Sequence, residues 1–179
     1  IRKKVWALGV STTNDVSVSG GDDKVGRFYL SFQDAYIKGV VPKDKYHRDA
    51  LRFNGSKVYG KVKVGFDGTF AFDKSDRTNS DFYFFALNTP GWIPIDKLTD
   101  WQTNPFANPN GYFNDYYNNP WFELDNNRGL IRNNYFNGNL NIEFKPVSWL
   151  TFNYRLGTAL TNTFEKDWSN RFDYSEYAK

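Results

Sequence analysis

The sequence predicts an all-β chain in which about six long antiparallel strands, joined as consecutive hairpins, form a segment of a transmembrane β-barrel. Apolar and polar residues alternate over long stretches, as they do in strands whose two faces meet different surroundings. Short and long connections between these stretches also alternate. The longest purely apolar run, 82–87, falls far short of the roughly 20 residues that a membrane-spanning helix needs.

The clearest alternation runs from Asn134 to Asn162 and predicts two strands joined by a turn at 145–148. Each strand is expected to have about 11–13 residues, against a usual length of about five or six, and a strand that crosses a bilayer needs about 9–11. The length therefore favours a transmembrane hairpin. One face of this hairpin carries Phe136, Gly138, Leu140, Ile142, Phe144, Leu150, Phe152, Tyr154, Leu156 and Leu160.

Four more strands are predicted in the N-terminal half of the chain. The apolar run at 5–10 is expected to be a strand tail or a packed loop. Connections are expected at 20–25, 38–46 and 56–60, and a long loop at 74–130 follows the fourth strand. The apolar positions that define these strands are Val16, Val18, Phe28, Leu30, Phe32, Tyr36, Leu51, Phe53, Val62, Val64, Phe66, Phe70 and Phe72.

The connections differ systematically in length. Those at 20–25, 56–60 and 145–148 are short and lie at one end of the strands, whereas those at 38–46 and 74–130 are long and lie at the other. This asymmetry is typical of an outer-membrane barrel, which has short periplasmic turns and longer extracellular loops. The apolar faces are therefore expected to meet lipid, and the polar faces a wet lumen.

Charged and aromatic side chains refine this orientation. A cation on the lipid face costs about 2–4 kcal/mol at mid-membrane, so Lys61, Lys63 and Arg155 are expected to point into the lumen. Asp34 has the parity of the apolar positions in its strand and is predicted at or above the outer interface. Aromatic residues near the predicted strand ends would form interfacial girdles. These residues are Tyr36, Tyr46, Tyr59 and Trp149.

Six strands cannot close a membrane barrel, because the smallest barrels have about eight and an open edge in hydrocarbon leaves backbone groups unpaired. The sequence also begins at Ile1, contains no Met and has no signal peptide. These observations predict that residues 1–179 are a portion of one larger barrel domain.

The composition excludes several other classes of protein. The mean hydropathy of −0.68 is too polar for a helical membrane protein. With no cysteine, the chain has neither a disulfide framework nor a thiolate metal site. The net charge of +3 is small and its charges are scattered, so we expect no nucleic-acid-binding face.

The long loop combines prolines and asparagines with many aromatic residues, whereas disordered segments are depleted in aromatics. Two interpretations stay open. The aromatics either pack a small core of the loop itself, or some of them form a platform that stacks on a sugar ring or grips a peptide. The candidate substrate-binding residues are Trp101, Tyr112, Tyr116, Tyr117 and Trp121.

Nothing in the sequence favours catalysis, a cofactor or a metal, and we expect no enzyme. The single histidine, His47, lies at a predicted strand start and is expected to be solvated or interfacial. The acidic pairs Asp22–Asp23 and Asp73/Asp76 are the only candidates for cation binding, and solvation in turns explains them adequately.

With this framework in place, the chain resembles the SusC/RagA family of TonB-linked outer-membrane transporters from Bacteroidetes. The order and spacing of several stretches carry the resemblance. These stretches are Val16-Ser17-Val18-Ser19-Gly20-Gly21 with Asp23-Lys24; Gly39-Val40-Val41-Pro42 with Tyr46-His47-Arg48; Ala86-Leu87-Asn88-Thr89-Pro90; Asn108-Pro109-Asn110-Gly111-Tyr112; Tyr117-Asn118-Asn119-Pro120; and Lys145-Pro146, Trp149-Leu150 and Tyr154-Arg155-Leu156-Gly157.

The resemblance implies a 22-stranded barrel in the outer membrane of a Gram-negative bacterium, with an N-terminal plug and a TonB box that are not in this chain. Such transporters work with a SusD-like lipoprotein lid. They import oligosaccharides, glycans or peptides, and TonB pulls on the plug to open a path. In that setting this chain would supply barrel wall in contact with outer-membrane lipid, together with part of the extracellular cargo surface.

Two alternatives remain at this point. In a soluble secreted β-sandwich that binds carbohydrate, two sheets would pack their apolar faces about 10 Å apart. Phe66, Phe70, Leu140 and Phe152 would then lie in a dry interior. The second alternative is a barrel wall that serves adhesion or protein secretion.

Overall fold

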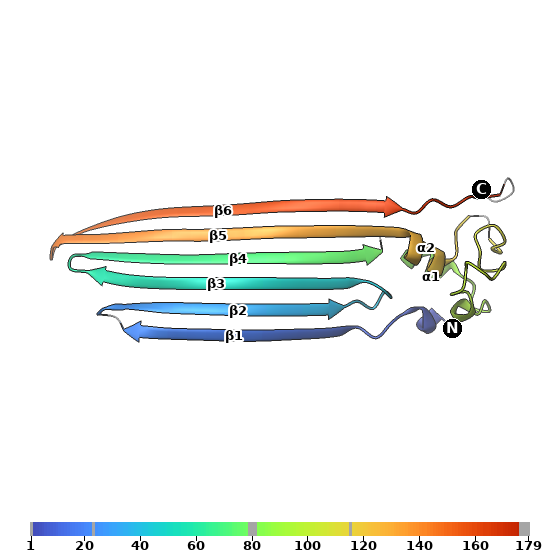
Figure 1. The fold of residues 1–179 in the computed structure, drawn as a ribbon, viewed down its shortest axis with the longest axis horizontal. Helices are drawn as coiled ribbons and strands as arrows, with labels where there is room; N and C mark the ends of the chain where they lie inside the picture. Colours follow the sequence, from blue (N-terminus) through green and yellow to red (C-terminus); the bar gives the residue numbers. More distant parts are fainter. Residues whose placement is uncertain (1, 23, 79–81, 115, 176–179) are drawn as a thin grey trace.

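The computed structural model describes residues 2–22, 24–78, 82–114 and 116–175. They form one six-stranded antiparallel sheet in the order β1-β2-β3-β4-β5-β6, so each strand pairs with its neighbour in sequence (Figure 1). This confirms the predicted all-β fold of consecutive hairpins. The strands are β1 (Val10–Asp22), β2 (Gly26–Lys38), β3 (Lys45–Tyr59), β4 (Val62–Thr78), β5 (Asn127–Val147) and β6 (Leu150–Ser169).

Several predicted boundaries were wrong because pairing continues past polar and turn-like residues. β5 has 21 residues and β6 has 20, longer than predicted. A bulge between Phe144 and Val147 carries β5 through 145–146, so the link to β6 is 148–149 rather than 145–148. The link at 56–60 contracts to 60–61, where Gly60 has a left-handed φ of 58°.

The connections at the other end also differ from the prediction. The loop expected at 38–46 spans 39–44, and the one expected at 74–130 spans 79–126, because β4 and β5 keep pairing there. The predicted turn at 20–25 narrows to 23–25. The contrast between short and long connections is unchanged, and the two long ones lie together at one end of the sheet, which we call the loop end (Figure 1).

Directly paired residues in neighbouring strands share a face, and the register aligns the apolar residues in rows across the sheet. One row runs Val16, Phe32, Leu51, Phe70, Phe136 and Leu160 from β1 to β6. The adjacent row on the opposite face runs Ser17, Ser31, Arg52, Thr69, Asn137 and Ala159. We call these two sides the apolar face and the polar face.

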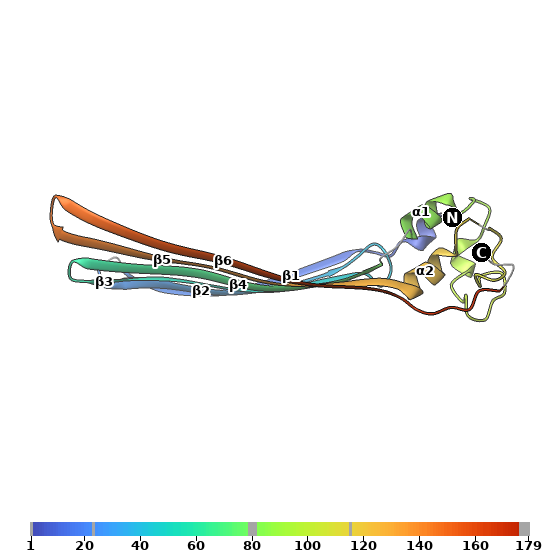
Figure 2. The same ribbon diagram turned by 90° about the horizontal axis from the view of Figure 1, so that it is seen from above.

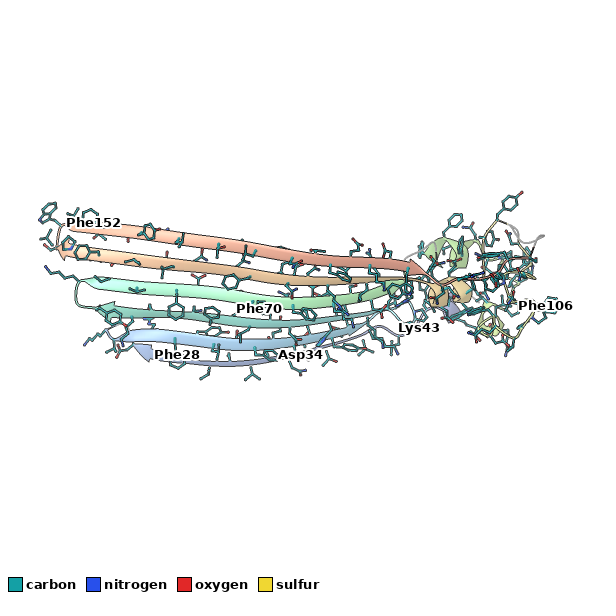
Figure 3. The ribbon with its side chains drawn as sticks, turned by 45° about the horizontal axis from the view of Figure 1, so that its top comes forward. Phe28, Asp34, Lys43, Phe70, Phe106 and Phe152 are labelled. Atoms are coloured by element: carbon teal, nitrogen blue, oxygen red, sulfur yellow. The ribbon has the colours of Figure 1, made fainter. Side chains whose placement is uncertain are left out.

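The sheet is a single layer when seen edge-on (Figure 2). No second sheet covers the apolar face within the part of the chain that the structure describes. Phe70 keeps 46% and Phe152 keeps 56% of its surface exposed, and their side chains project from the ribbon in Figure 3. These residues therefore do not lie between two stacked layers.

Large rings on the apolar face cover glycines on the neighbouring strand. Phe53 is paired with Gly68, and Phe66 is paired with Gly55. A Cβ atom at Gly68 would lie 2.3 Å from Cζ of Phe53, so the ring occupies the space that a side chain would need. The two rings lie 6.2 Å apart between centroids and close the gap over β3 and β4.

A separate compact unit, which we call the cap, lies beyond the loop end (Figures 1 and 2). It comprises η1 (Arg2–Val5), α1 (Phe82–Asn88), η2 (Ile95–Lys97), α2 (Pro120–Asn126) and the described residues that connect α1 to α2. Val5 packs in the cap while Val10 begins β1, so the apolar run at 5–10 is divided between the two units. No described helix is long and apolar enough to cross a membrane.

Two small hydrophobic clusters hold the cap together. The first comprises Val5, Phe82, Ala86, Ile95 and Leu124 and joins η1 to all three elements of the long loop. The second comprises Leu98, Ala107 and Tyr112. The interpretation in which loop aromatics pack a small core is therefore confirmed for Phe82, Tyr112 and Phe122, which are buried.

Arg128 stabilises the loop end of the sheet through several hydrogen bonds. Its guanidinium is 9% exposed and donates to Asp44 Oδ1 at 3.1 Å, to Asp76 Oδ1 at 2.6 Å and to Thr78 Oγ1 at 3.0 Å. Asp44 also accepts from the backbone N–H of Thr78 at 2.8 Å. One cation thus ties the connection between β2 and β3 to the end of β4 and the start of β5.

The cap core gives a first prediction. Replacing Ile95, which is 1% exposed, with Ala leaves a cavity and should cost the cap about 2–5 kcal/mol of local stability. Amide hydrogen exchange should speed up in α1 and α2 and stay unchanged in the strands. The matched control is Phe106→Ala, at a side chain that is 76% exposed. Equal exchange in the two variants would contradict a cap with its own core.

Candidate functional site

The cap is organised around a buried asparagine that the sequence did not single out. The Asn119 side chain caps α2 by accepting from the backbone N–H of Trp121 at 3.0 Å. Its amide donates to the carbonyl oxygens of Leu98 at 2.7 Å and Ala107 at 2.9 Å. An asparagine before Pro120 at a helix start is a recognisable capping signal in the sequence. Its two hydrogen bonds to Leu98 and Ala107, which are distant in sequence, depend on the tertiary fold.

A second polar contact joins the N-terminal segment to the cap. Lys4 Nζ lies 2.7 Å from Asp96 Oδ2, which links η1 to η2. This hydrogen bond lowers the pKa of the Asp96 carboxyl below its ordinary value. The Lys4 side chain is 60% exposed and that of Asp96 is 26% exposed, so solvent screens the contact and it orients η1 more than it stabilises the cap.

Four of the five predicted substrate-binding aromatics are packed within the cap. Tyr112 is buried in the second cluster, and Trp121 packs against both clusters and donates from Nε1 to the carbonyl of Ile95 at 2.7 Å. Trp101 packs against the second cluster and donates to Asp125 Oδ2 at 3.0 Å. Tyr117 donates from its hydroxyl to the carbonyl of Asn88 at 2.8 Å.

Tyr116, the fifth, is 92% exposed, and its backbone N–H is fixed by Asn114 Oδ1 at 2.7 Å. The five residues therefore do not form one continuous surface. That any of them contacts cargo stays a prediction, and Tyr116 is the one that offers a free ring without unpacking the cap.

Other loop aromatics are exposed on the cap and were not among the five. They are Tyr83, Phe84, Trp92, Phe106 and Phe113. Phe106, labelled in Figure 3, lies at the tip farthest from the sheet. The loop lacks a regular hydrophobic period, so its residue order does not distinguish a packed aromatic from an exposed one.

A polar hollow of about 330 Å³ adjoins this tip. Its amides also shape the loop, since Asn104 Oδ1 accepts from the N–H of Phe106 and Asn108 Oδ1 from that of Asn110, both at 3.0 Å. Exposed aromatic rings beside amide groups are the combination that binds sugars and peptides. The hollow is lined by Gln102, Thr103, Asn104, Pro105, Asn108, Asn110 and Gly111.

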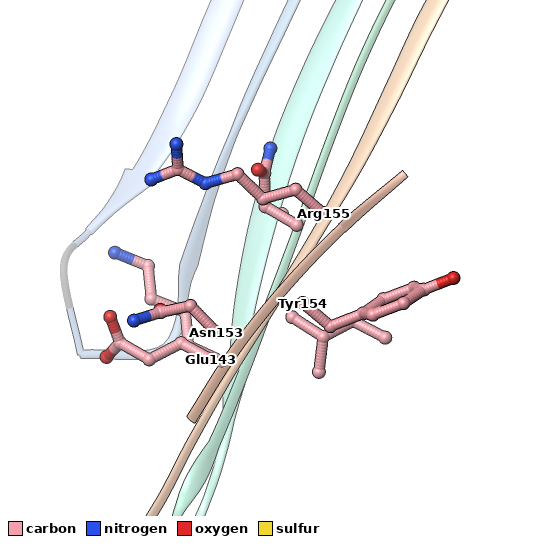
Figure 4. Close-up of a pocket in the computed structure, with 8 residues that line it drawn as sticks. Glu143, Asn153, Tyr154 and Arg155 are labelled. Atoms are coloured by element: carbon pink, nitrogen blue, oxygen red, sulfur yellow. The ribbon is translucent and has the colours of Figure 1, made fainter. Parts of the chain in front are cut away.

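The polar face carries a second hollow near the short turns, with a volume of about 200 Å³. Figure 4 shows Asn153 and Arg155 on one side of β6 and Tyr154 on the other, which displays the alternation directly. Glu143 joins the polar side and pairs with Lys145 at 2.9 Å. Lys63 also lines the hollow, whereas Lys61 lies in the turn and donates to the carbonyl of Pro146.

Candidate cation ligands are placed differently from the sequence expectation. Asp73 and Asp76 are strand residues of β4 on opposite faces, so the interpretation as a solvated turn pair was wrong. Asp73 accepts from Asn133 at 2.8 Å and Asp76 from Arg128. Asp22 accepts from the N–H groups of its own turn, and Asp23 lies outside the described residues.

Asp34, His47 and Asp49 form the one group of metal-ligand type found among the described residues. His47 Nε2 lies 2.7 Å from Asp34 Oδ2 and 3.7 Å from Asp49 Oδ1. All three lie on the apolar face at its loop-end border, and the two carboxylates already have a partner in the histidine. Tyr46, expected in an aromatic girdle, lies instead on the polar face.

No protein-family model matches the chain, and no curated protein does either. Among solved structures, the chain is similar to a chain in a cryo-EM structure of the Gasdermin A3 membrane pore, at 8% identity and a TM-score of 0.14. The match covers 92% of this chain and 59% of that one. A likeness this weak carries no argument about fold or function.

The buried phenol in the cap gives a second prediction. The Tyr112 hydroxyl makes no hydrogen bond of good geometry among the described residues, and burial, opposed in part by the side chain of Thr89, raises its pKa to about 12. Ionising this phenol therefore costs the cap about 2–3 kcal/mol, so its stability is unaffected below pH 10 and falls as the pH rises from 10 through 12. Tyr112→Phe should remove this loss and be no less stable at pH 7.

The measurement is tryptophan fluorescence of the cap across alkaline pH. Tyr116→Phe is the matched control, because Tyr116 is exposed and its loss removes the same hydroxyl. Identical alkaline transitions for wild type and Tyr112→Phe would show that the Tyr112 hydroxyl is not responsible.

Proposed function

We propose that this sheet is part of the wall of an outer-membrane β-barrel, with its apolar face against acyl chains and its polar face against an aqueous lumen. The observation that carries the proposal is the single-layer sheet with an apolar face that no described segment covers. Monomeric soluble proteins rarely expose apolar patches of this kind. A lipid bilayer supplies the apolar partner that the chain lacks.

The dimensions of the apolar face support this orientation. On β4 it extends from Val62 to Phe72, about 34 Å along the strand at about 3.4 Å per residue. A strand tilt of about 40° reduces this to about 26 Å across the membrane, close to the roughly 25 Å band of known barrels. Polar or charged residues border the band on the same face at both ends.

At the short-turn end of the band, Lys57 extends along the apolar face with Nζ 5.2 Å from the centre of the Tyr59 ring. A lysine whose stem lies on apolar surface while its charge reaches the interface is typical of membrane proteins. Trp149 is exposed in the adjacent turn. Both aromatics lie where an interfacial girdle is expected.

The edges of the sheet indicate that more strands belong to the wall. β1 and β6 each pair on one side only in the described sheet. Unpaired backbone groups are not tolerated in hydrocarbon, so further strands must continue the sheet on both sides. A larger barrel of the SusC/RagA type, with 22 strands, meets this requirement.

In this proposal the cap faces the extracellular space and forms part of the cargo surface of a TonB-dependent importer. The exposed rings and the amide-lined hollow at its tip suit oligosaccharides or peptides. A SusD-like lipoprotein would close over this side. TonB would act through a plug contributed by the rest of the transporter.

The orientation predicts opposite accessibility for adjacent residues of β5. The chain has no cysteine, so Leu140→Cys and Asn139→Cys each introduce one site for a nitroxide spin label in this chain. In outer-membrane vesicles, the label at 140 should be relaxed by lipid-soluble O₂ and not by a water-soluble nickel chelate. The label at 139 should show the reverse.

The experiment separates the proposal from a soluble sandwich, in whose interior a label at 140 would meet neither reagent. Nickel access at 140 would also overturn the proposal. Co-purification of a lid lipoprotein distinguishes an importer from a barrel that serves adhesion or secretion.

Cargo contact at the cap gives a further prediction. Tyr116→Ala should weaken binding of a labelled oligosaccharide or peptide mixture by a factor of about two to thirteen, because one aromatic contact contributes about 0.5–1.5 kcal/mol. Its exchange protection in the cap should match wild type. Trp149→Ala, at a ring that is 82% exposed in the β5–β6 turn at the opposite end of the sheet, is the matched control and should bind as wild type does. Unchanged binding in Tyr116→Ala would remove Tyr116 from the cargo surface.

A further inference from the structure

Toward the loop end, the residues on the apolar face change abruptly from apolar to polar and charged. Beyond the last apolar row, a border row across the sheet contains Asn14, Asp34, Asp49, Phe72, Asn134 and Asn162. The next row contains Thr12, Tyr36, His47, Lys74, Arg132 and Phe164. The row after that contains Val10, Lys38, Lys45, Asp76, Leu130 and Lys166.

Basic residues outnumber acidic ones in these two outer rows. Asp76 is the one carboxylate in them, and it is already paired with Arg128. Lys45, Lys74 and Arg132 are exposed and make no ion pair with another described residue. The face that carries the apolar band therefore ends in a belt of unneutralised cations.

A hollow of about 260 Å³ lies within this belt, lined by Tyr36, Lys45, His47, Lys74 and Asp76. Its lining combines two ammonium groups, a phenol and an imidazole with the Asp76 carboxylate, which accepts from Arg128 Nη2 at 2.6 Å. Lysine binds phosphate as a point charge, and a tyrosine hydroxyl adds a hydrogen-bond donor. The space exceeds the size of one phosphate group.

The carboxylates of the border row do not oppose an anion in this hollow. Lys45, His47 and Asp49 follow one another at every second position of β3 and therefore lie in that order along one face, with Lys45 nearest the cap. Asp34 of β2 is paired with Asp49, so both acids lie on the acyl-chain side of His47. His47 Nε2 and Asn14 Nδ2 both contact the Asp34 carboxylate, at 2.7 and 3.3 Å. His47 thus lies between the two acids and Lys45, while Lys74 is paired with His47 in the row next to the acids.

We propose that Lys45 and Lys74, with Arg132 beside them, bind the phosphate of an anionic lipid headgroup in the leaflet on the cap side. This inference rests on the proposed membrane orientation, since only then do these side chains lie at headgroup depth directly above acyl chains. Charge complementarity favours an anionic lipid, because clustered basic residues at a membrane surface attract anionic headgroups. A lipid in this position would hold the sheet at a fixed depth.

The test measures lipid affinity by native mass spectrometry of the intact transporter in detergent. The probes are lipid A and phosphatidylglycerol, with phosphatidylcholine as the uncharged comparison. The variant is Lys45→Gln with Lys74→Gln, which keeps polar side chains only one atom shorter and removes two charges. Affinity for the anionic lipids should fall about 30-fold, since each basic residue near a membrane surface contributes about a factor of five.

The matched control is Arg52→Gln with Lys63→Gln, which removes two cations from the polar face of the same two strands. It should bind the anionic lipids as wild type does. Unchanged lipid affinity in the Lys45/Lys74 variant, or an equal loss in the control, would overturn the proposal. So would competition by inorganic phosphate at the same concentration as lipid, which would identify a free-phosphate site.

Spin-label accessibility at position 140 is independent of the two lysines. It therefore distinguishes failure of the headgroup site from failure of the proposed membrane orientation. If the label at 140 meets O₂ and the lysine variant still binds anionic lipid normally, the headgroup site is wrong and the membrane orientation stands. If the label at 140 meets the nickel chelate, both proposals fall together.

Discussion

The uncovered apolar face of the sheet is the constraint on which the rest of the molecule depends. Hairpin pairing satisfies the backbone hydrogen bonds between strands but leaves the phenylalanines of one face without a covering layer. Fully burying one such side chain contributes about 1.5–3 kcal/mol, so the face is strongly stabilised by an apolar medium. Because side chains alternate, the same constraint turns the charged residues toward the other side and gives the sheet two chemically different surfaces.

The cap is stabilised differently, by a small core and by buried hydrogen bonds. The Asn119 side chain makes hydrogen bonds to three segments at once. The cost of burying this side chain is compensated because both of its polar atoms have partners. The link between cap and sheet depends on backbone continuity with β4 and β5 and on the connection between β2 and β3, where Lys43 pairs with Asp125 of α2. A cap with a separate core can change its exposed residues without disturbing the sheet.

The period-two pattern predicted the six strands, their order and the residues on each face, because alternation is local information. The turns were misplaced where pairing outlasts the pattern, as at the bulge between Phe144 and Val147. The roles of Asn119 and Arg128 could not be predicted, since their partners are distant in sequence. The aromatic-rich composition of the loop predicted that the loop is folded. It did not predict which rings are buried, because burial also depends on partners distant in sequence, as the contrast between Tyr112 and Tyr116 illustrates.

Strand pairing continues toward the cap beyond the point where the apolar band ends, and this difference in extent sets the distance between the band and the cap. β4 remains paired to Thr78, about 20 Å along the strand beyond Phe72, where its apolar face ends. Over that distance the same face is mostly basic and polar, so the paired strands extend beyond the apolar band toward the cap. In the membrane orientation that we propose, this extension would place the cap beyond the lipid headgroups, where its exposed rings would be accessible to a solute.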